Sequence, residues 1–175
     1  LVIDEEQRFG VVHKEKIKKI KANVDVISMS ATPIPRTLQM SLSGLKEMSL
    51  IETPPINRKS VQTYVLKTNE SVIREAIYRE MARKGQVFYL LNKIIKLEEI
   101  ASKVKKLVPK AHVGIIHGKM DKDEIEDVMS KFYNGEIDVL VCTSIIETGL
   151  DIANANSIIV ENADKFGLSQ LYQIK

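Results

Sequence analysis

Short apolar runs that alternate with amphipathic stretches constrain the fold of this chain more than any other feature. The stretch from Asp121 to Tyr133 places apolar residues at helical spacing, and Asp121 and Glu124 have the spacing of an N-terminal capping box. The apolar runs lack polar alternation, which is typical of a parallel sheet covered by helices on both faces. We therefore expect an α/β fold. The expected strands are Leu1–Ile3, Val26–Ser30, Val61–Leu66, Val87–Leu91, Val113–Ile116, Val139–Cys142 and Ser157–Val160.

A segment with two adjacent prolines divides the chain. Pro54 and Pro55 hold the backbone extended and remove two amide donors, which suits a linker better than the interior of an element. We expect a linker over residues 53–60, between a first domain over 1–52 and a second over 61–175. The first has two expected strands, and we interpret it as the C-terminal part of an α/β domain. The second has five and is nearly complete.

Composition excludes several classes of protein. The 175 residues are 44% hydrophobic and 28% charged, and no apolar run approaches the roughly 20 residues that span a bilayer. We therefore expect no membrane partner and a cytoplasmic location. The single cysteine, Cys142, stands in an apolar run and is expected to be buried. A net charge of +3 does not by itself indicate a nucleic-acid partner, and the lysines between residues 14 and 21 are interpreted as a solvated helix face.

Acidic residues follow the first apolar run directly. Ligands of open α/β sheets bind at the carboxyl ends of strands, where Asp4 and Glu5 are expected to lie. A nucleotide-hydrolysing protein needs a carboxylate there to hold Mg²⁺, usually through water, and can use a second to activate the attacking water. Asp4 suits the first role and Glu5 the second, although a solvated strand end would have the same sequence.

Small polar residues follow other strands. Ser30 and Thr32 come at the end of the second expected strand, and His117 and Gly118 follow the fifth. After the strand ending at Cys142 the sequence continues Thr-Ser-Ile-Ile-Glu-Thr-Gly-Leu-Asp, in which hydroxyl groups and a glycine suit contact with a phosphate. Each stretch alone also fits an ordinary turn or helix cap.

In their order, these stretches resemble the motif series of superfamily 2 helicases and translocases. Residues 4–7 (Asp-Glu-Glu-Gln) stand as motif II, 30–32 (Ser-Ala-Thr) as motif III, and 143–151 as motif V, with the start of motif VI at 173–175. The longer stretches 4–11 and 30–37 are similar to the RecG-like branch. Within that branch the chain is more similar to the transcription-repair coupling factors, because RecG tends to have Asp-Glu-Gln-His at motif II.

The resemblance implies two RecA-like domains that bind ATP and Mg²⁺ between them, with the C-terminal part of the first and most of the second present here. It implies that Asp4 holds Mg²⁺ through water and that Glu5 and Gln7 take part in hydrolysis. The other roles follow motif by motif. Coupling between nucleotide and DNA is assigned to Ser30, Ala31 and Thr32, nucleotide contact to Gly149 and Asp151, and DNA-backbone contact to Arg36, His117, Gly118, Thr143 and Thr148.

The implied function is ATP-dependent translocation on double-stranded DNA. In the coupling factors this motion displaces stalled RNA polymerase and recruits excision-repair proteins, through parts of the protein outside these residues. The 175 residues contain no Gly-x4-Gly-Lys-Ser/Thr phosphate loop and only the first residues of motif VI. The chain by itself is therefore expected to hydrolyse no ATP.

Two other interpretations stay open. A RecG-type helicase that remodels branched DNA uses the same motor, and the difference lies mostly outside these residues. A non-catalytic α/β interaction module would keep the shape alone, but such a module has no physical need for carboxylates at strand ends.

Overall fold

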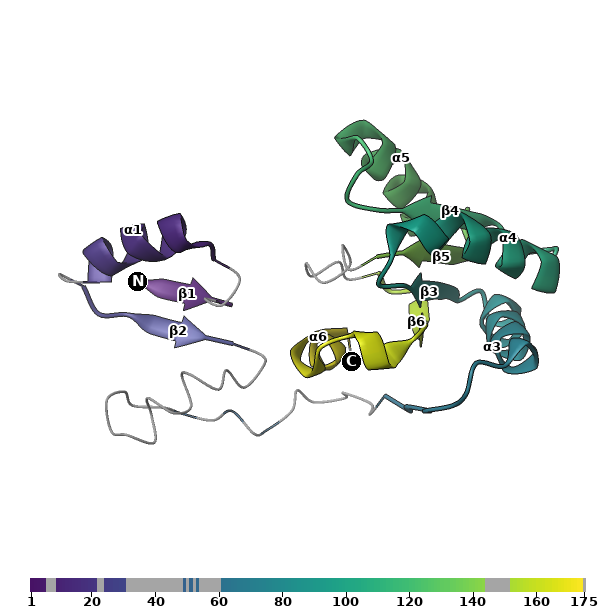
Figure 1. Cartoon of the computed structure of the whole chain (residues 1–175), viewed down its shortest axis with the longest axis horizontal. Helices are drawn as coiled ribbons and strands as arrows, with labels where there is room; N and C mark the ends of the chain where they lie inside the picture. The colour runs from purple at the N-terminus through teal and green to yellow at the C-terminus, as the bar shows by residue number, and fades with distance from the viewer. Residues whose placement is uncertain are drawn as a thin grey trace. The chain divides into compact units, whose positions relative to one another are not determined.

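The computed structural model describes residues 1–5, 9–21, 24–30, 49, 51, 53, 61–143 and 152–174. It divides the chain into two compact units, one within Leu1–Gln62 and the other spanning Thr63–Ile174. Figure 1 labels the helices and strands of both. None of the helices in these ranges has the length and apolar content that crossing a membrane requires.

The described residues of the first unit form two parallel strands and one helix. Strand β1 (Val2–Asp4) leads to helix α1 (Val11–Lys21), which returns the chain to strand β2 (Ile27–Met29). The strands pair in parallel from Val2 opposite Ile27 to Asp4 opposite Met29. Both strands were expected from the sequence, and Ile3 is buried as an apolar strand residue should be.

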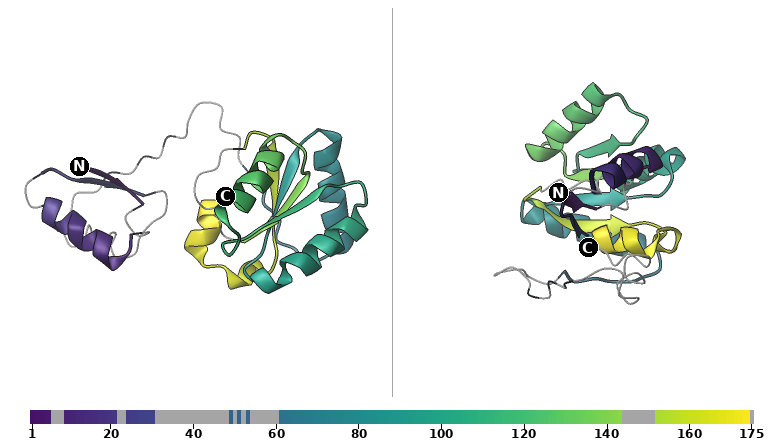
Figure 2. Two further views of the ribbon diagram at one scale, coloured as in Figure 1. Left: turned by 90° about the horizontal axis from the view of Figure 1, so that it is seen from above. Right: turned by 90° about the vertical axis from the view of Figure 1, so that its left-hand side faces the viewer.

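The second unit is a four-stranded parallel sheet with helices on both faces. The order of its strands is β4-β5-β3-β6, so that β3, the first of the four in the sequence, lies between β5 and β6. Figure 2 (left) shows helices on either side of this sheet. Its elements are α3 (Glu70–Ala82), β3 (Gln86–Leu90), the 3-10 turn η2 (Ile94–Lys96), α4 (Leu97–Leu107), β4 (Val113–Ile116), α5 (Lys122–Tyr133), β5 (Val139–Cys142), β6 (Ala155–Val160), the 3-10 turn η4 (Ala163–Lys165) and α6 (Leu168–Ile174).

Alternate residues of the central strand β3 fill two separate cores. Val87 and Tyr89 point to the side where α3 and α4 pack, whereas Phe88 and Leu90 point to the side of α5 and α6. Because both sides of the sheet are covered, every residue of β3 is buried, which explains why its sequence shows no polar alternation. The expected α/β class with parallel strands is therefore confirmed.

Two local expectations are also confirmed. Helix α5 begins after the N-cap residue Asp121, whose backbone N–H donates to the Glu124 carboxylate at 3.3 Å. Cys142 is a free thiol with no exposed surface, and burial raises its pKa. It therefore acts as a small apolar core residue.

The expected strand Val61–Leu66 is wrong. Residues 61–69 contain no regular secondary structure, and Val65 is 94% exposed. The β-branched and aromatic residues of this segment favour an extended backbone, but a strand also needs a neighbour that takes its hydrogen bonds. The sheet of the second unit accordingly has four of the five strands expected there.

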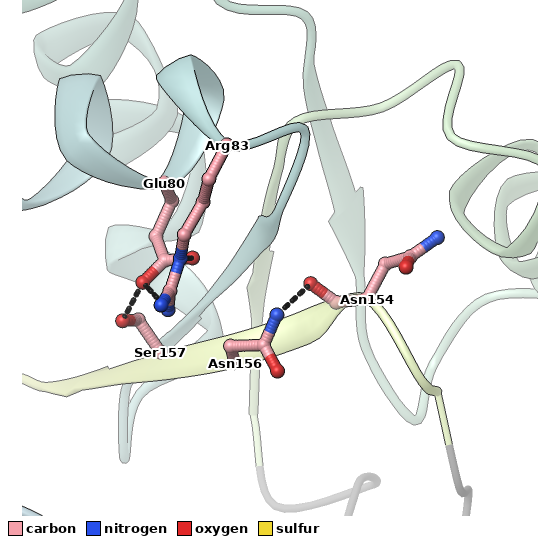
Figure 3. Close-up of polar contacts among 5 residues, drawn as sticks. All are labelled: Glu80, Arg83, Asn154, Asn156 and Ser157. Atoms are coloured by element: carbon pink, nitrogen blue, oxygen red, sulfur yellow. Dashed lines mark hydrogen bonds and ion pairs between the residues drawn. The ribbon is translucent and has the colours of Figure 1, made fainter.

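A buried carboxylate joins helix α3 to strand β6 at the amino end of the sheet (Figure 3). Glu80 is only 2% exposed, and its carboxylate accepts hydrogen bonds from Arg83 and from the hydroxyl of Ser157. Buried charge is costly unless it is paired and hydrogen-bonded, so this cluster satisfies the requirement within the fold. It also fixes the position of α3 against the edge strand.

Candidate functional site

Three predicted site residues meet at the carboxyl end of the first unit's strands. Asp4 is the last residue of β1 and lies opposite Met29, the last residue of β2. The backbone N–H of Glu5 donates to the Met29 carbonyl at 3.0 Å, and Ser30 follows Met29 directly. The structure therefore brings Asp4, Glu5 and Ser30 to one end of the two-stranded sheet.

The backbone at Glu5 is left-handed, with φ of 49°. This conformation costs a non-glycine residue about 1 kcal/mol or more. It turns the chain sharply after β1, while the hydrogen bond to Met29 holds the turn against β2. Asp4 stays exposed at the strand end and Glu5 is partly exposed, so both carboxylates are accessible to a ligand.

The donor set at this strand end fits a weakly held Mg²⁺. Mg²⁺ keeps several of its waters and is commonly bound through one or two carboxylates together with substrate phosphates. The exposed Asp4 carboxylate has the chemistry for such an outer contact. Across the residues that the structure describes, no three metal-ligating side chains gather into a site.

The carboxyl ends of all four strands of the second unit form one row. The pairing aligns the last residues of the strands across the sheet, in the order Ile116, Cys142, Leu90 and Val160. The residues that follow them stand along a single edge because all the strands are parallel. These residues are His117, Thr143, Leu91 and Glu161. The structure thus brings the predicted site residues His117 and Thr143 to the same edge.

His117 opens a tight turn at this edge. Its carbonyl accepts the N–H of Met120 at 3.1 Å, and Gly118 within the turn is exposed. The imidazole is partly buried, and its Nδ1 atom has no hydrogen-bond partner among the described residues. The turn thus presents an exposed glycine where the sequence predicted contact with a phosphate, whereas this ring nitrogen is buried.

A cavity of about 270 Å³ lies beside Thr143 at the same edge. It is formed where the loop after β3 faces η4 and α6. The residues around it are Leu91, Asn92, Thr143, Lys165, Phe166 and Gln170. Of these six, sequence reasoning identified only Thr143, because the other five carry no motif and come together only when strand order places β3 between β5 and β6.

A buried tyrosine supports this edge from inside the sheet. Tyr89 is 1% exposed, and its hydroxyl donates to the carboxylate of Glu161, which follows β6. Burial, together with this hydrogen bond to a carboxylate, raises the pKa of Tyr89 far above its ordinary value. The two residues are 72 positions apart, so no local pattern could have predicted the pair.

Several predicted site residues lie outside the described part of the chain. These are Gln7, Ala31, Thr32, Arg36, Thr148, Gly149 and Asp151. Their proposed roles therefore rest on the sequence.

Comparison with known proteins defines the class of this fold. A structure of RecG bound to a three-way DNA junction superposes on 98% of this chain with a TM-score of 0.70 and 35% identity, and the chain covers 23% of it. A structure of Saccharomyces cerevisiae Dbp5 bound to RNA and ADP BeF3 matches over 98% of the chain and 48% of its own, with a TM-score of 0.63 and 16% identity. The likeness to Dbp5 shows the fold alone. The fold is that of RecA-like helicase domains.

The family follows from the sequence comparison. Residues 68–175 match the family described as "Helicase conserved C-terminal domain". The chain belongs to this family. It is also 60% identical over its whole length to the transcription-repair-coupling factor of Bacillus subtilis (strain 168), of which it spans 15%.

Proposed function

We propose that this chain is the part of an ATP-dependent double-stranded DNA translocase that runs from motif II to the start of motif VI. The observation that carries the proposal is the 60% identity over all 175 residues to a transcription-repair-coupling factor. Since the chain spans 15% of that relative, the activity belongs to a longer protein. Its parent in the cell would displace stalled RNA polymerase and recruit excision-repair proteins, in the bacterial cytoplasm.

The first unit supplies the hydrolytic carboxylates in this proposal. Asp4 would hold Mg²⁺ through water, and the ion would neutralise charge on the ATP phosphates. Glu5 would orient and deprotonate the attacking water, with Gln7 beside it. The exposed position of Asp4 at the end of β1 supports this division of roles.

The remaining motifs are proposed to contact the nucleotide and to transmit its state to the DNA-binding residues. Gly149 and Asp151 would contact the nucleotide. Ser30, Ala31 and Thr32 would couple its state to DNA, since Ser30 lies at the same strand end as Asp4. Closing and opening of two domains around ATP would then produce steps along the duplex.

DNA binding is proposed to involve the backbone of the duplex. A translocase should not depend on sequence, and phosphate contacts position a protein without reading bases. The edge that carries His117, Gly118 and Thr143 supports this assignment through the hydroxyl of Thr143 and the exposed Gly118. Arg36 and Thr148 are proposed to contact the same backbone.

A second candidate function is remodelling of branched DNA. It is favoured by the likeness to RecG, whose structure was solved on a three-way junction. The motor chemistry would be the same in both cases.

The test uses the full-length parent protein. We expect Mg²⁺-dependent ATP hydrolysis that duplex DNA stimulates and that Glu5→Gln abolishes. Glu15→Gln, which changes an exposed glutamate of α1, is the matched control and should hydrolyse ATP normally. Release of a stalled RNA polymerase by the parent would support the coupling function, whereas junction unwinding without such release would favour the second candidate. Absence of DNA-stimulated hydrolysis would refute both.

A further inference from the structure

We propose that Tyr89 is a positioning residue for ATP hydrolysis in the parent, because by holding Glu161 it fixes the place from which helix α6 carries the chain into motif VI. The inference rests on the proposed function, in which residues 173–175 begin that motif. It concerns a contact in the interior of the second unit, which the motif series does not include. Since Tyr89 is only 1% exposed, it acts through Glu161 and touches neither nucleotide nor DNA.

Packing alone does not require the hydroxyl of Tyr89. The ring lies in the core on the side of the sheet where α3 and α4 pack. A phenylalanine would fill the same place with no polar atom to satisfy, whereas a buried hydroxyl without a hydrogen bond is costly. The hydroxyl avoids this cost by donating to the carboxylate of Glu161, 72 positions further along the chain. What the hydroxyl adds to the ring is therefore a tie to Glu161.

Glu161 is attached to strand β3 by both its backbone and its side chain. It directly follows β6, and its N–H donates to the Leu90 carbonyl at 3.0 Å. Its carboxylate accepts from Tyr89, the residue before Leu90 in the same strand. Hydrogen bonds to a charged group are stronger than those between neutral groups, so the side-chain contact is the firmer of the two. Together they hold the chain where it leaves the sheet.

The chain turns sharply directly after Glu161. Asn162 has a left-handed backbone with φ of 51°, and its carbonyl accepts the N–H of Lys165 at 2.8 Å within the turn η4. Phe166 then packs against the core on the other side of the sheet, where α5 and α6 lie. Residues 161–166 therefore cross the carboxyl edge of the sheet, with Glu161 held on one side and Phe166 on the other.

Helix α6 depends on this crossing for its position. It is seven residues long, and helices of this length are not stable by themselves in water, so tertiary contacts decide where it lies. The packing of Ile174 against the core holds its far end. Loss of the Tyr89 hydrogen bond would loosen the near end, and motif VI would then be held less precisely. A misplacement of about 1 Å can lower a catalytic rate about a hundredfold.

The test measures steady-state Mg²⁺-ATP hydrolysis by the full-length parent in the presence of duplex DNA. We expect Tyr89→Phe to lower kcat about tenfold and to leave KM for ATP within about twofold, because the contact serves the catalytic step more than nucleotide binding. The matched control is Ser157→Ala, which also removes a hydroxyl that donates to a carboxylate, at the amino end of the same sheet. It should lose stability and keep its kcat.

Variants of Glu161 separate the hydrogen bond from the tyrosine ring. Glu161→Gln keeps an oxygen acceptor for Tyr89 and should retain most of the kcat, whereas Glu161→Ala should lose as much as Tyr89→Phe. The double variant of Tyr89→Phe with Glu161→Ala should lose no more than either single variant, because both remove the same contact. Since Glu161 is only partly buried, its replacement tests the inference even if Tyr89→Phe does not fold.

Hydrogen exchange gives a measurement that does not depend on activity. When it is followed by mass spectrometry over residues 161–174 of the parent, exchange should be faster in Tyr89→Phe than in the wild type. It should be unchanged in Ser157→Ala, whose contact lies at the other end of the sheet.

Each outcome decides the inference. Equal kcat values for Tyr89→Phe and Ser157→Ala would overturn it, while DNA-stimulated hydrolysis by the wild-type parent would still support the proposed function. Faster exchange with unchanged kcat would also overturn it, because the contact would then be structural only. A loss from Glu161→Gln as large as that from Glu161→Ala would do the same, since the charge and not the hydrogen bond would then matter. A parent without DNA-stimulated hydrolysis would reject the proposed function, and this inference with it.

Discussion

The Ser157 hydroxyl donates a hydrogen bond of 2.5 Å to the Glu80 carboxylate, which fastens helix α3 to the edge strand β6. Arg83 donates to both oxygens of the same carboxylate, from Nε at 2.7 Å and from Nη2 at 2.5 Å. Because β6 pairs only with β3 in the described sheet, this side-chain contact gives the strand a second attachment.

Ser157→Ala should destabilise the second unit. Hydrogen bonds to charged groups contribute about 1.5–3 kcal/mol, and the variant leaves one site on a buried carboxylate unfilled. We expect the free energy of unfolding, measured with urea, to fall by an amount near the lower figure. Asn156→Ala is the matched control, since its exposed amide donates to the neighbouring Asn154 carbonyl and not to Glu80 (Figure 3). Equal losses from both variants would contradict the role given to Ser157.

Gly85→Ala should also be destabilising, through the same carboxylate. A Cβ atom at this position would lie 2.4 Å from Oε2 of Glu80. Relieving such overpacking typically costs about 1–3 kcal/mol. Gly10→Ala, where a Cβ would meet no atom within 4 Å, is the control.

A double-mutant cycle identifies the cause. If the clash with Glu80 produces the loss, Gly85→Ala should cost much less in a Glu80→Ala background. If the losses of the two single variants simply add in the double variant, the strain caused by Gly85→Ala does not come from contact with Glu80.

The parallel sheet could be predicted because local pattern and global burial agree there. The apolar runs that became the central strands β3 and β5 are buried throughout, and those of the edge strands β4 and β6 are largely partly buried, so each run carries the apolar pattern of a covered sheet by itself. The polar residues that follow these strands, such as His117 and Thr143, lie at one edge because the strands are parallel. The candidate phosphate contacts of motif V lie partly outside the described residues, so their roles stay predictions.

Contacts that depend on strand order could not be predicted. Glu80 and Ser157 are 77 residues apart, and Tyr89 and Glu161 are 72 apart. Nothing in the sequence around either pair indicates its partner, because the order β4-β5-β3-β6 is a property of the assembled sheet. The segment 61–66 shows the converse, because its residues favour a strand locally and yet it contains no regular secondary structure.

Stability should fall in alkali because Cys142 is buried. Burial raises the pKa of its thiol above the ordinary value of 9.0, so the folded state keeps a proton that the unfolded chain releases. The stabilisation is fully present below about pH 9 and is lost as pH rises further, by up to about 1.4 kcal/mol per pH unit. Tyr89, whose raised pKa has an ordinary value of 10.0, adds a loss of the same sign above that pH.

Urea unfolding at several pH values between about 8 and 10 measures this dependence. Cys142→Ala should lower stability at every pH but remove most of the slope between about pH 9 and 10, where Tyr89 contributes little. An unchanged slope would show that the thiol is not the group that titrates.

The chain alone should hydrolyse no ATP, although it carries Asp4 and Glu5. Cleavage of ATP needs backbone amides and a lysine that cradle the phosphates, and these come from a phosphate loop that the 175 residues do not contain. Without that cradle the exposed carboxylates at the end of β1 repel the nucleotide and do not position it. Release of phosphate from Mg²⁺-ATP, followed with and without duplex DNA, should therefore match the buffer control for the wild-type chain and for Glu5→Gln. Steady turnover by the wild-type chain that Glu5→Gln abolishes would instead show that these residues form a complete catalytic site.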